Sequence, residues 1–279
     1  MKRRKVILAT ILALALILHT YVYFTQLDFD SIMEQRRLDI QTYCVDDGFS
    51  TRKDTQVKNI MTVREVSWCP VPGVYDGFYL KMLQLSGIST EEIEKLQLLY
   101  GPENLQDLSE SQIAPQNVHT IDHAKEKNAK WLVIVAHPWI RLVSIYQSCY
   151  EKFNYNCFLK HGKLMLKNDS LVVTFEDFIE YVLLNPQVSQ WRPATQLCQV
   201  CFRPYNYVLK SETIQTEEMY WWAKLGVVST TFNYLVSRPT QTWENTEKYL
   251  HLLTQKQMDQ VLRMYQSDFR AFGYSHLSA

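Results

Sequence analysis

A cation and a hydroxyl group stand in the first turns of an expected helix, directly after an expected buried strand. Residues 131–135 form a short apolar run rich in β-branched residues, which is typical of a strand inside a parallel sheet. Pro138 ends this run and favours the first turn of a helix, and Arg141 and Ser144 follow on a different side of that helix from its apolar positions. Backbone N–H groups and the helix dipole attract anions at such a helix start. The stretch therefore predicts an anion-binding site made by a strand, a turn and a helix.

A second strand, loop and helix precede this unit in the chain. Within residues 63–87 an apolar strand ends in Pro-Val-Pro-Gly, and a loop from Gly73 to Gly77 leads to an apolar helix. Because backbone N–H groups in such loops point at bound anions, the order is that of a phosphate-binding loop. From its residues alone, an ordinary structural turn is the stronger interpretation of this loop.

The first unit resembles the 3′-phosphate-binding segment of the Golgi carbohydrate sulfotransferases of the chondroitin and dermatan type. The family pattern is V-R-x-P-x-x-R-L-V-S-A-Y, and residues 135–146 read V-A-H-P-W-I-R-L-V-S-I-Y. The resemblance implies that five positions lie beside the 3′-phosphate of the sulfate donor: Ala136, His137, Pro138, Arg141 and Ser144. Ala136 stands where the family has an arginine, so one expected cation is missing.

The glycine-flanked loop resembles the 5′-phosphosulfate loop of the same family, V-P-K-x-x-C/S-x-N-W-K-R. The resemblance implies donor contacts at five positions: Pro72, Gly73, Val74, Gly77 and Lys81. In the family pattern a lysine neutralises the bridging oxygen as the sulfuryl group leaves, and Gly73 replaces that lysine here. Asp76 lies inside the loop, and Lys81 is what remains of the closing Lys-Arg pair.

Two later regions match the family in register. Residues 190–213 carry Q-W-R-P-A-T-Q-L-C-Q-V-C followed by Y-N-Y-V-L-K-S-E-T, similar to H-W-x-P-x-x-x-L-C-x-x-C and Y-D-x-I-x-K-x-E-T. Residues 265–274 read Y-Q-S-D-F-R-A-F-G-Y and resemble the closing Y-x-x-D-F-x-x-F-G-Y. Gln190 and Asn206 stand where the family has histidine and aspartate.

The resemblance covers residues 60–275 and implies an α/β protein with the P-loop-like sulfotransferase fold. A central parallel sheet then binds the nucleotide at the carboxyl ends of its strands. The implied reaction moves a sulfuryl group from 3′-phosphoadenosine 5′-phosphosulfate (PAPS) to a glycan hydroxyl and needs no metal. As in phosphoryl transfer, cationic groups stabilise the anion during in-line attack. No residue is assigned as the catalytic base.

The polar losses at Gly73, Ala136 and Gln190 leave a second interpretation open. A fold is kept in some proteins after its site has changed, so the alternative is a sulfotransferase-like binding or scaffold protein of the secretory pathway without turnover. Three cations are candidates for the missing charge: Lys81, Arg141 and Lys210. A P-loop kinase is disfavoured because the sequence has no G-K-S/T motif.

The amino terminus predicts the compartment. Residues 2–5 are Lys-Arg-Arg-Lys, and residues 6–24 carry no formal charge. At about 1.5 Å per residue, a helix of that length spans about 28 Å, close to the hydrocarbon thickness of a bilayer. The basic flank favours a cytosolic amino terminus, hence a single-pass type II membrane protein, and the family resemblance implies that its membrane is that of the Golgi. A cleavable signal peptide is disfavoured by the bulky residues Tyr21, Tyr23 and Phe24.

We expect four parts along the chain. They are a cytosolic tail at residues 1–5, a transmembrane signal anchor at 6–24, a stem at 25–60 and a lumenal sulfotransferase-like domain at 61–279. A helix packed on the domain is an alternative for residues 29–40 of the stem. Within the domain, Thr174 is expected to begin an amphipathic helix, and Thr254 with Gln257 forms a capping-box pattern.

Six cysteines, an even number, fit an oxidising lumen. Cys198 and Cys201 form a C-x-x-C motif that, alone, also suits a zinc ribbon or a redox pair. The second C-x-x-C of a zinc ribbon is absent, and the motif lies in an expected loop instead of opening a helix. We therefore expect both cysteines to form disulfides. Asn168 begins the one N-glycosylation sequon.

Charge and histidine spacing limit the partners. The chain has 29 basic and 29 acidic residues, so it gives no electrostatic case for nucleic-acid binding. His119 and His123 have the spacing of one helix face, but no third metal ligand accompanies them. The resemblance implies a glycan acceptor as partner, and the amino-terminal segment adds the membrane.

Overall fold

The computed structural model describes most of the predicted lumenal domain. Its described residues are 28–47, 60–63, 65–74, 76–89, 91–92, 95, 129–151, 172–227 and 242–276. None of the helices in these ranges has the length and apolar character needed to cross a bilayer. The expected signal anchor at 6–24, the sequon at Asn168 and the pair His119 and His123 lie outside the described residues.

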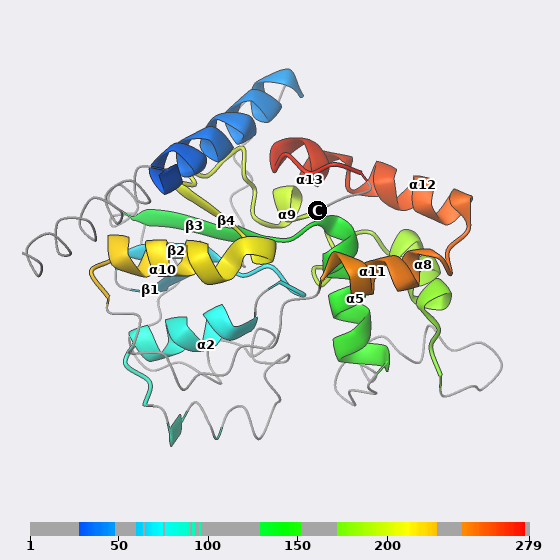
Figure 1. Cartoon of the computed structure of the whole chain (residues 1–279), viewed down its shortest axis with the longest axis horizontal. Helices are drawn as coiled ribbons and strands as arrows, with labels where there is room; N and C mark the ends of the chain where they lie inside the picture. Colours follow the sequence, from blue (N-terminus) through cyan, green and yellow to red (C-terminus); the bar gives the residue numbers. More distant parts are fainter. Residues whose placement is uncertain are drawn as a thin grey trace, which may run out of the picture.

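A four-stranded sheet lies at the centre of the molecule (Figure 1). In spatial order its strands are β1 (Met61–Val63), β2 (Val66–Cys69), β3 (Lys130–Val135) and β4 (Tyr207–Lys210). β2, β3 and β4 are parallel, whereas β1 is antiparallel to β2. β3 is buried from Trp131 to Val135, as a strand covered on both faces must be. The predicted α/β class with a parallel sheet is confirmed.

Helices cover both faces of the sheet. α2 (Asp76–Leu85) and α10 (Ile214–Lys224) lie on one side, and a helix of residues 28–46 and α13 (Gln266–Ala271) lie on the other (Figure 1). We call residues 28–46 the N-terminal helix. Two short helices, α9 (Ala194–Leu197) and the 3₁₀ helix η5 (Ser211–Thr213), complete this part.

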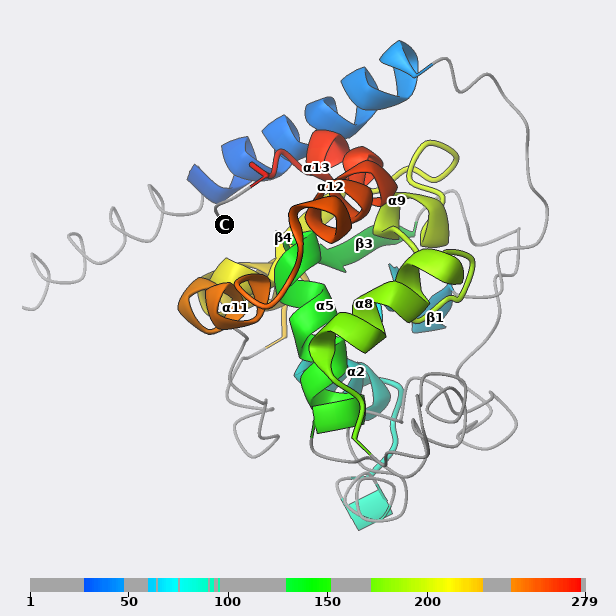
Figure 2. The same cartoon turned by 90° about the vertical axis from the view of Figure 1, so that its right-hand side faces the viewer.

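A second group of helices lies beyond the carboxyl end of β3 (Figures 1 and 2). Its members are α5 (Pro138–Tyr146), the π-helical turn η3 (Gln147–Glu151), α8 (Phe175–Leu184), α11 (Trp243–Leu250) and α12 (Gln255–Met264). Their apolar residues form a hydrophobic cluster separate from the one around the sheet. α5 starts directly after β3, so it links the two clusters.

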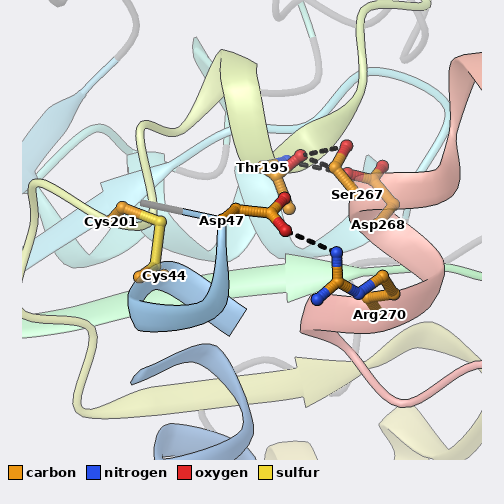
Figure 3. The surroundings of a disulfide bond; sticks show 7 residues. All are labelled: Cys44, Asp47, Thr195, Cys201, Ser267, Asp268 and Arg270. Atoms are coloured by element: carbon orange, nitrogen blue, oxygen red, sulfur yellow. Dashed lines mark hydrogen bonds and ion pairs between the residues drawn. A yellow bond between two sulfur atoms is a disulfide. The ribbon is translucent and has the colours of Figure 1, made fainter. Parts of the chain in front are cut away.

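The N-terminal helix is packed against the domain, although it falls within the expected stem. Arg36 donates two hydrogen bonds to the buried carboxylate of Glu217, at 2.7 and 2.8 Å. Cys44, near the other end of the helix, forms a disulfide with Cys201 (Figure 3). An ion pair and a covalent bond thus join residues 28–46 to the domain, as the alternative for this part of the segment anticipated.

The two cysteines of the C-x-x-C motif are both oxidised, as expected, but each has a distant partner. Cys198 pairs with Cys69 at the end of β2, and Cys201 pairs with Cys44. The sequence separations are 129 and 157 residues. Because such long loops lose much conformational freedom when closed, both bonds are expected to stabilise the folded chain.

Candidate functional site

The two predicted donor-binding segments meet at one edge of the sheet. β2 and β3 are adjacent and parallel, so the loops after their carboxyl ends lie side by side. The Nε of Arg141 in α5 donates to the carbonyl oxygen of Pro72 at 2.8 Å. Gly73, the next loop residue, faces Ile145 of α5. The structure therefore brings together two segments that are about 60 residues apart in the sequence.

Gly73 fits this contact because it has no side chain. Its φ is +76°, in the left-handed region that favours glycine. A Cβ atom at this position would lie 2.4 Å from Cγ1 of Ile145 and 3.1 Å from the carbonyl oxygen of Arg141. The lysine of the family pattern would therefore be strained at this φ and would require Ile145 or the loop to shift.

The remaining predicted positions of these segments have small or apolar side chains. Pro72 and Val74 flank Gly73, and Gly77 lies in the first turn of α2. Ala136 follows β3 and is buried, and Pro138 is the first residue of α5. These positions shape the backbone of the site and contribute no charge.

Arg141 is a buried clamp between three segments. Its Nη1 donates to the carbonyl oxygen of Arg192 at 2.8 Å and its Nη2 to that of Gln190 at 3.1 Å, in addition to the bond to Pro72. The side chain is only 1% exposed, and burial lowers the pKa of its guanidinium. Its polar atoms are therefore bonded to backbone carbonyls inside the protein.

The start of α5 is capped by groups of the protein itself. The backbone N–H of His137 donates to Oε1 of Glu212 at 2.5 Å, and the backbone N–H of Trp139 donates to Nδ1 of His137 at 3.3 Å. Nε2 of His137 donates to the carbonyl oxygen of Ser275 at 2.8 Å. Burial lowers the pKa of His137 to about 4, so the ring is neutral at neutral pH.

Glu212 is a site residue to which the sequence motifs assigned no role. Its carboxylate lies where the sequence predicted a bound anion, and Tyr274 donates to its Oε2 at 3.2 Å. Burial raises the pKa of Glu212, against the opposing effect of the hydrogen bond from His137. The glutamate of the K-x-E-T pattern was the available signal for this position.

The other two candidate cations also have partners within the protein. Nζ of Lys81 bonds both carboxylate oxygens of Glu218, at 2.7 and 2.8 Å, and this ion pair joins α2 to α10. Nζ of Lys210 lies 4.2 Å from the ring centre of Tyr274, and burial lowers the pKa of Lys210. Among the described residues, the predicted replacements for the missing charge are thus engaged in structural contacts.

Ser144 differs from these groups. It is partly exposed on α5, and its hydroxyl makes no hydrogen bond with the described part of the chain. The helix continues through the π-helical turn η3, a distortion that is common at functional sites. Among the polar residues that were predicted to contact the sulfate donor, Ser144 is therefore the one whose side chain remains available to bind an anion.

The two later matching regions hold each other in place. The carboxylate of Asp268, in α13, accepts hydrogen bonds from the backbone N–H of Ala194 at 2.7 Å and of Thr195 at 2.9 Å. Figure 3 shows Asp268 beside Thr195. The same carboxylate also accepts a hydrogen bond from the hydroxyl of Thr195, at 2.7 Å. Burial raises the pKa of Asp268, and these hydrogen bonds oppose that effect. Asp268 thus caps the start of α9.

The side chain of Gln190, in the position of the family's histidine, contacts a cysteine. Its Nε2 donates to Sγ of Cys149 at 3.2 Å, and its backbone carbonyl accepts from Arg141. Cys149 itself is disulfide-bonded. In the described ranges, no cluster of three His, Cys, Asp or Glu residues has the arrangement of a metal site.

Comparison with known proteins identifies one family. The family model described as "Sulfotransferase family" matches residues 55–275 of the chain. No solved structure matches the chain.

Three curated relatives illustrate the similarity. Carbohydrate sulfotransferase 12 of Mus musculus is 26% identical over 181 residues, which are 56% of this chain and 42% of that protein. Carbohydrate sulfotransferase 11 of Rattus norvegicus is 26% identical over 179 residues, 57% of this chain and 50% of that protein. Carbohydrate sulfotransferase 10 of Danio rerio is 22% identical over 288 residues, 89% of this chain and 76% of that protein. The chain thus spans about half the length of the first two relatives.

Proposed function

The chain belongs to the sulfotransferase family, and from this membership we propose that it transfers a sulfuryl group from PAPS to a hydroxyl group of a glycan. The relatives named as carbohydrate sulfotransferases support the acceptor class. One observation carries the proposal. The loops after β2 and β3, which resemble the two phosphate-binding segments of the family, meet at one edge of the sheet through the contact of Arg141 with Pro72.

The residues of this edge suit different parts of the donor. The available hydroxyl of Ser144 suits the 3′-phosphate, and the loop that turns at Gly73 with positive φ is the part of this edge that would face the 5′-phosphosulfate. Arg141 acts as a positioning residue, because its bond to Pro72 fixes the distance between the two loops. PAPS supplies an activated sulfuryl group, so the protein's part is to bind and align the donor with the acceptor hydroxyl.

A transfer assay tests this function. The full chain is incubated with PAPS carrying labelled sulfate and with a panel of desulfated glycans, and labelled glycan is counted. We expect transfer above a heat-inactivated control, and we expect Ser144→Ala to reduce it at least several-fold. Ser148→Ala removes the same hydroxyl one turn further along and should retain most of the activity. Absence of transfer to every glycan would refute the enzymatic proposal.

One observation favours a second candidate, a sulfotransferase-like binding protein without turnover. Lys81 is paired with Glu218, Arg141 is bonded to carbonyl groups, and the carboxylate of Glu212 occupies the start of α5. A donor would have to bind with little cationic help from these groups. The same assay separates the two candidates, since the binding protein is expected to bind a glycan but to give no labelled product.

The proposed location is the Golgi lumen. We propose that residues 6–24 anchor the chain in the membrane in the type II orientation and that residues 61–279 are lumenal. The disulfides of Cys69 with Cys198 and of Cys44 with Cys201 support an oxidising compartment. We further propose that the folded domain includes the N-terminal helix, which reduces the stem to the few residues before it.

A further inference from the structure

The N-terminal helix begins beside the carboxyl end of α10. Phe29 stacks on Tyr220 with ring centres 5.2 Å apart, and Asp30 forms an ion pair with Lys224 at 2.8 Å. Tyr220 and Lys224 belong to the last two turns of α10. The first residues of the N-terminal helix and the end of α10 therefore form one continuous surface.

This surface lies at the edge of the sheet where the parallel strands begin. α10 runs antiparallel to β4. Glu217, near the start of α10, accepts a hydrogen bond of 2.9 Å from the backbone N–H of Lys210, which ends β4. Further along, Trp221 contacts Tyr207 at the start of β4, with ring centres 4.5 Å apart. The carboxyl end of α10 is thus beside the amino-terminal edge of the sheet, and Figure 1 shows the start of the N-terminal helix at the same end.

The candidate donor site lies at the opposite edge. Pro72 follows β2, and His137 and Ser144 follow β3, all after the carboxyl ends of their strands. β3 has six residues, so at about 3.3 Å per residue the two edges are about 17–20 Å apart. The helix start and the site therefore face opposite directions.

The N-terminal helix is held to the domain at three points along its length. The contacts are Asp30 with Lys224, Arg36 with Glu217, and Cys44 with Cys201. Contacts near both ends and the middle prevent the helix from swinging away from the sheet. The position of its first residue is therefore fixed relative to the site.

The chain between the proposed anchor and this helix is short. Three residues, 25–27, separate Phe24 from Asp28. Even fully extended, that connection spans at most about 14 Å. With residues 6–24 in the bilayer, the first turn of the N-terminal helix has to lie close to the lipid headgroups.

We propose that the surface formed by the first turn of the N-terminal helix and the last turn of α10 lies against the phospholipid headgroups. The edge of the sheet that carries the candidate donor site then points away from the bilayer. This inference rests on the proposed membrane anchor and on the proposed function of the opposite edge. An acceptor then reaches the site from the lumen. A glycan on a lumenal protein or polysaccharide fits this arrangement, whereas the headgroup of a glycolipid in the same membrane does not.

The exposed residues of this surface suit a hydrated headgroup layer. They are charged or small: Asp28, Asp30, Ser31, Ala223, Lys224 and Gly226. Charged side chains at this surface are compatible with the polar interface of a bilayer and are costly in its hydrocarbon core. The surface is therefore expected to rest on the headgroups without inserting into the acyl chains.

Distance-dependent fluorescence quenching tests the orientation. The full chain is reconstituted into phosphatidylcholine vesicles that contain a small fraction of phosphatidylcholine with a nitroxide on its headgroup. A fluorophore is attached at Ala223→Cys or, as the control, at Leu252→Cys, an exposed position after α11 beyond the other edge. The introduced thiol is the labelling site, because no described cysteine is free. Both substitutions lie on the surface, and unfolding curves like that of the unmodified chain verify folding.

We expect the label at position 223 to be quenched several-fold more strongly than the label at position 252. Equal quenching, or stronger quenching at position 252, would overturn the orientation. Failure of the full chain to insert into vesicles would overturn it as well, together with the anchor. If the quenching pattern holds while the same vesicles transfer no sulfate to any glycan, the enzymatic proposal fails and the orientation stands.

A spacer variant tests the cause of the orientation. A flexible Gly-Ser segment of about a dozen residues inserted after Leu27 lengthens the tether without touching the described fold. We expect quenching at position 223 to fall toward that at position 252. Unchanged quenching would overturn the role of the short connection.

Discussion

Gly73 shows how one residue changes the chemistry available to the site. The loop after β2 approaches α5 so closely that a Cβ at this position would overlap Ile145. A lysine therefore cannot be accommodated by a side-chain rotation alone. The loss of the family lysine is thus a consequence of how the loop packs against α5, and other groups would have to bind the proposed donor.

Alanine substitutions separate the two reasons for glycine at this position. Gly73 and Gly226 both have positive φ, but a Cβ at Gly226 would meet no atom within 4 Å. Gly226→Ala should therefore cost only the backbone penalty of about 1–2 kcal/mol in the free energy of unfolding. Gly73→Ala should cost about 1–3 kcal/mol more, because it also overlaps Ile145. Denaturant unfolding of both variants measures the difference, and equal losses would contradict the close contact.

His137 predicts a dependence of stability on pH. Burial lowers its pKa in the folded state to about 4, below the unfolded value of about 6.5. The unfolded state therefore binds a proton first as the pH falls, so this contribution is complete above pH 6.5 and is lost progressively toward pH 4. Between pH 7 and 5 the free energy of unfolding should fall by up to about 2 kcal/mol on this account.

The comparison of two variants isolates this contribution. His137→Gln should flatten the pH dependence of unfolding between pH 7 and 5, whereas His251→Gln, at an exposed histidine, should leave it unchanged. Chemical denaturation at both pH values is the measurement. A His137 variant with the same slope as the unmodified chain would show that the buried ring does not control it.

At the scale of elements, local patterns predicted several elements well. The apolar run at 131–135 is β3, extended by one residue, and Pro138 begins α5. Thr174 caps α8, and Thr254 forms both hydrogen bonds of the capping box with Gln257. These features depend on residues within one turn or one strand, so the sequence carries them directly.

Contacts between distant segments were not predictable in the same way. The carboxylate of Glu212 reaches the start of α5 from 75 residues away, and Arg141 reaches Pro72 across 69 residues. The N-terminal helix buries Met33, Ile40 and Tyr43 in the core around the sheet. The partners of Arg36 and Cys44, which also hold it, are not identified by the sequence. Whether a cationic side chain is free to bind the sulfate donor or is bonded to a backbone carbonyl is likewise decided by tertiary packing.

The N-terminal helix provides a prediction at this scale. Replacing Cys44 and Cys201 together by serine removes the covalent link and should lower the free energy of unfolding by about 2–5 kcal/mol. Amide hydrogen exchange should rise across residues 28–46 more than in β3, because β3 is buried within the sheet. Unchanged exchange in this helix would show that the Arg36 ion pair and apolar packing hold it without the disulfide.

For the whole molecule, the sequence predicts that the domain lies on the lumenal side of one membrane anchor. In sealed microsomes, the chain from residue 25 onward should resist added protease, and Asn168 should carry a glycan that endoglycosidase removes. Detergent should abolish the protection. A carboxyl terminus that protease digests in intact microsomes would contradict the type II topology.

The family match spans residues 55–275, but family membership alone does not decide whether the donor site works. The described cations near the loops have internal partners, so donor binding is expected to be weak and to depend on Ser144. The central claim is that the loops after β2 and β3 form this donor site.

Calorimetric titration of the full chain in detergent with 3′-phosphoadenosine 5′-phosphate tests that claim most directly. A hydrogen bond from Ser144 to a charged phosphate contributes about 1.5–3 kcal/mol, so Ser144→Ala should weaken binding by about 10-fold or more. Ser148→Ala should bind like the unmodified chain. No binding by the unmodified chain, or binding that Ser144→Ala leaves unchanged, would contradict a donor site at this edge of the sheet.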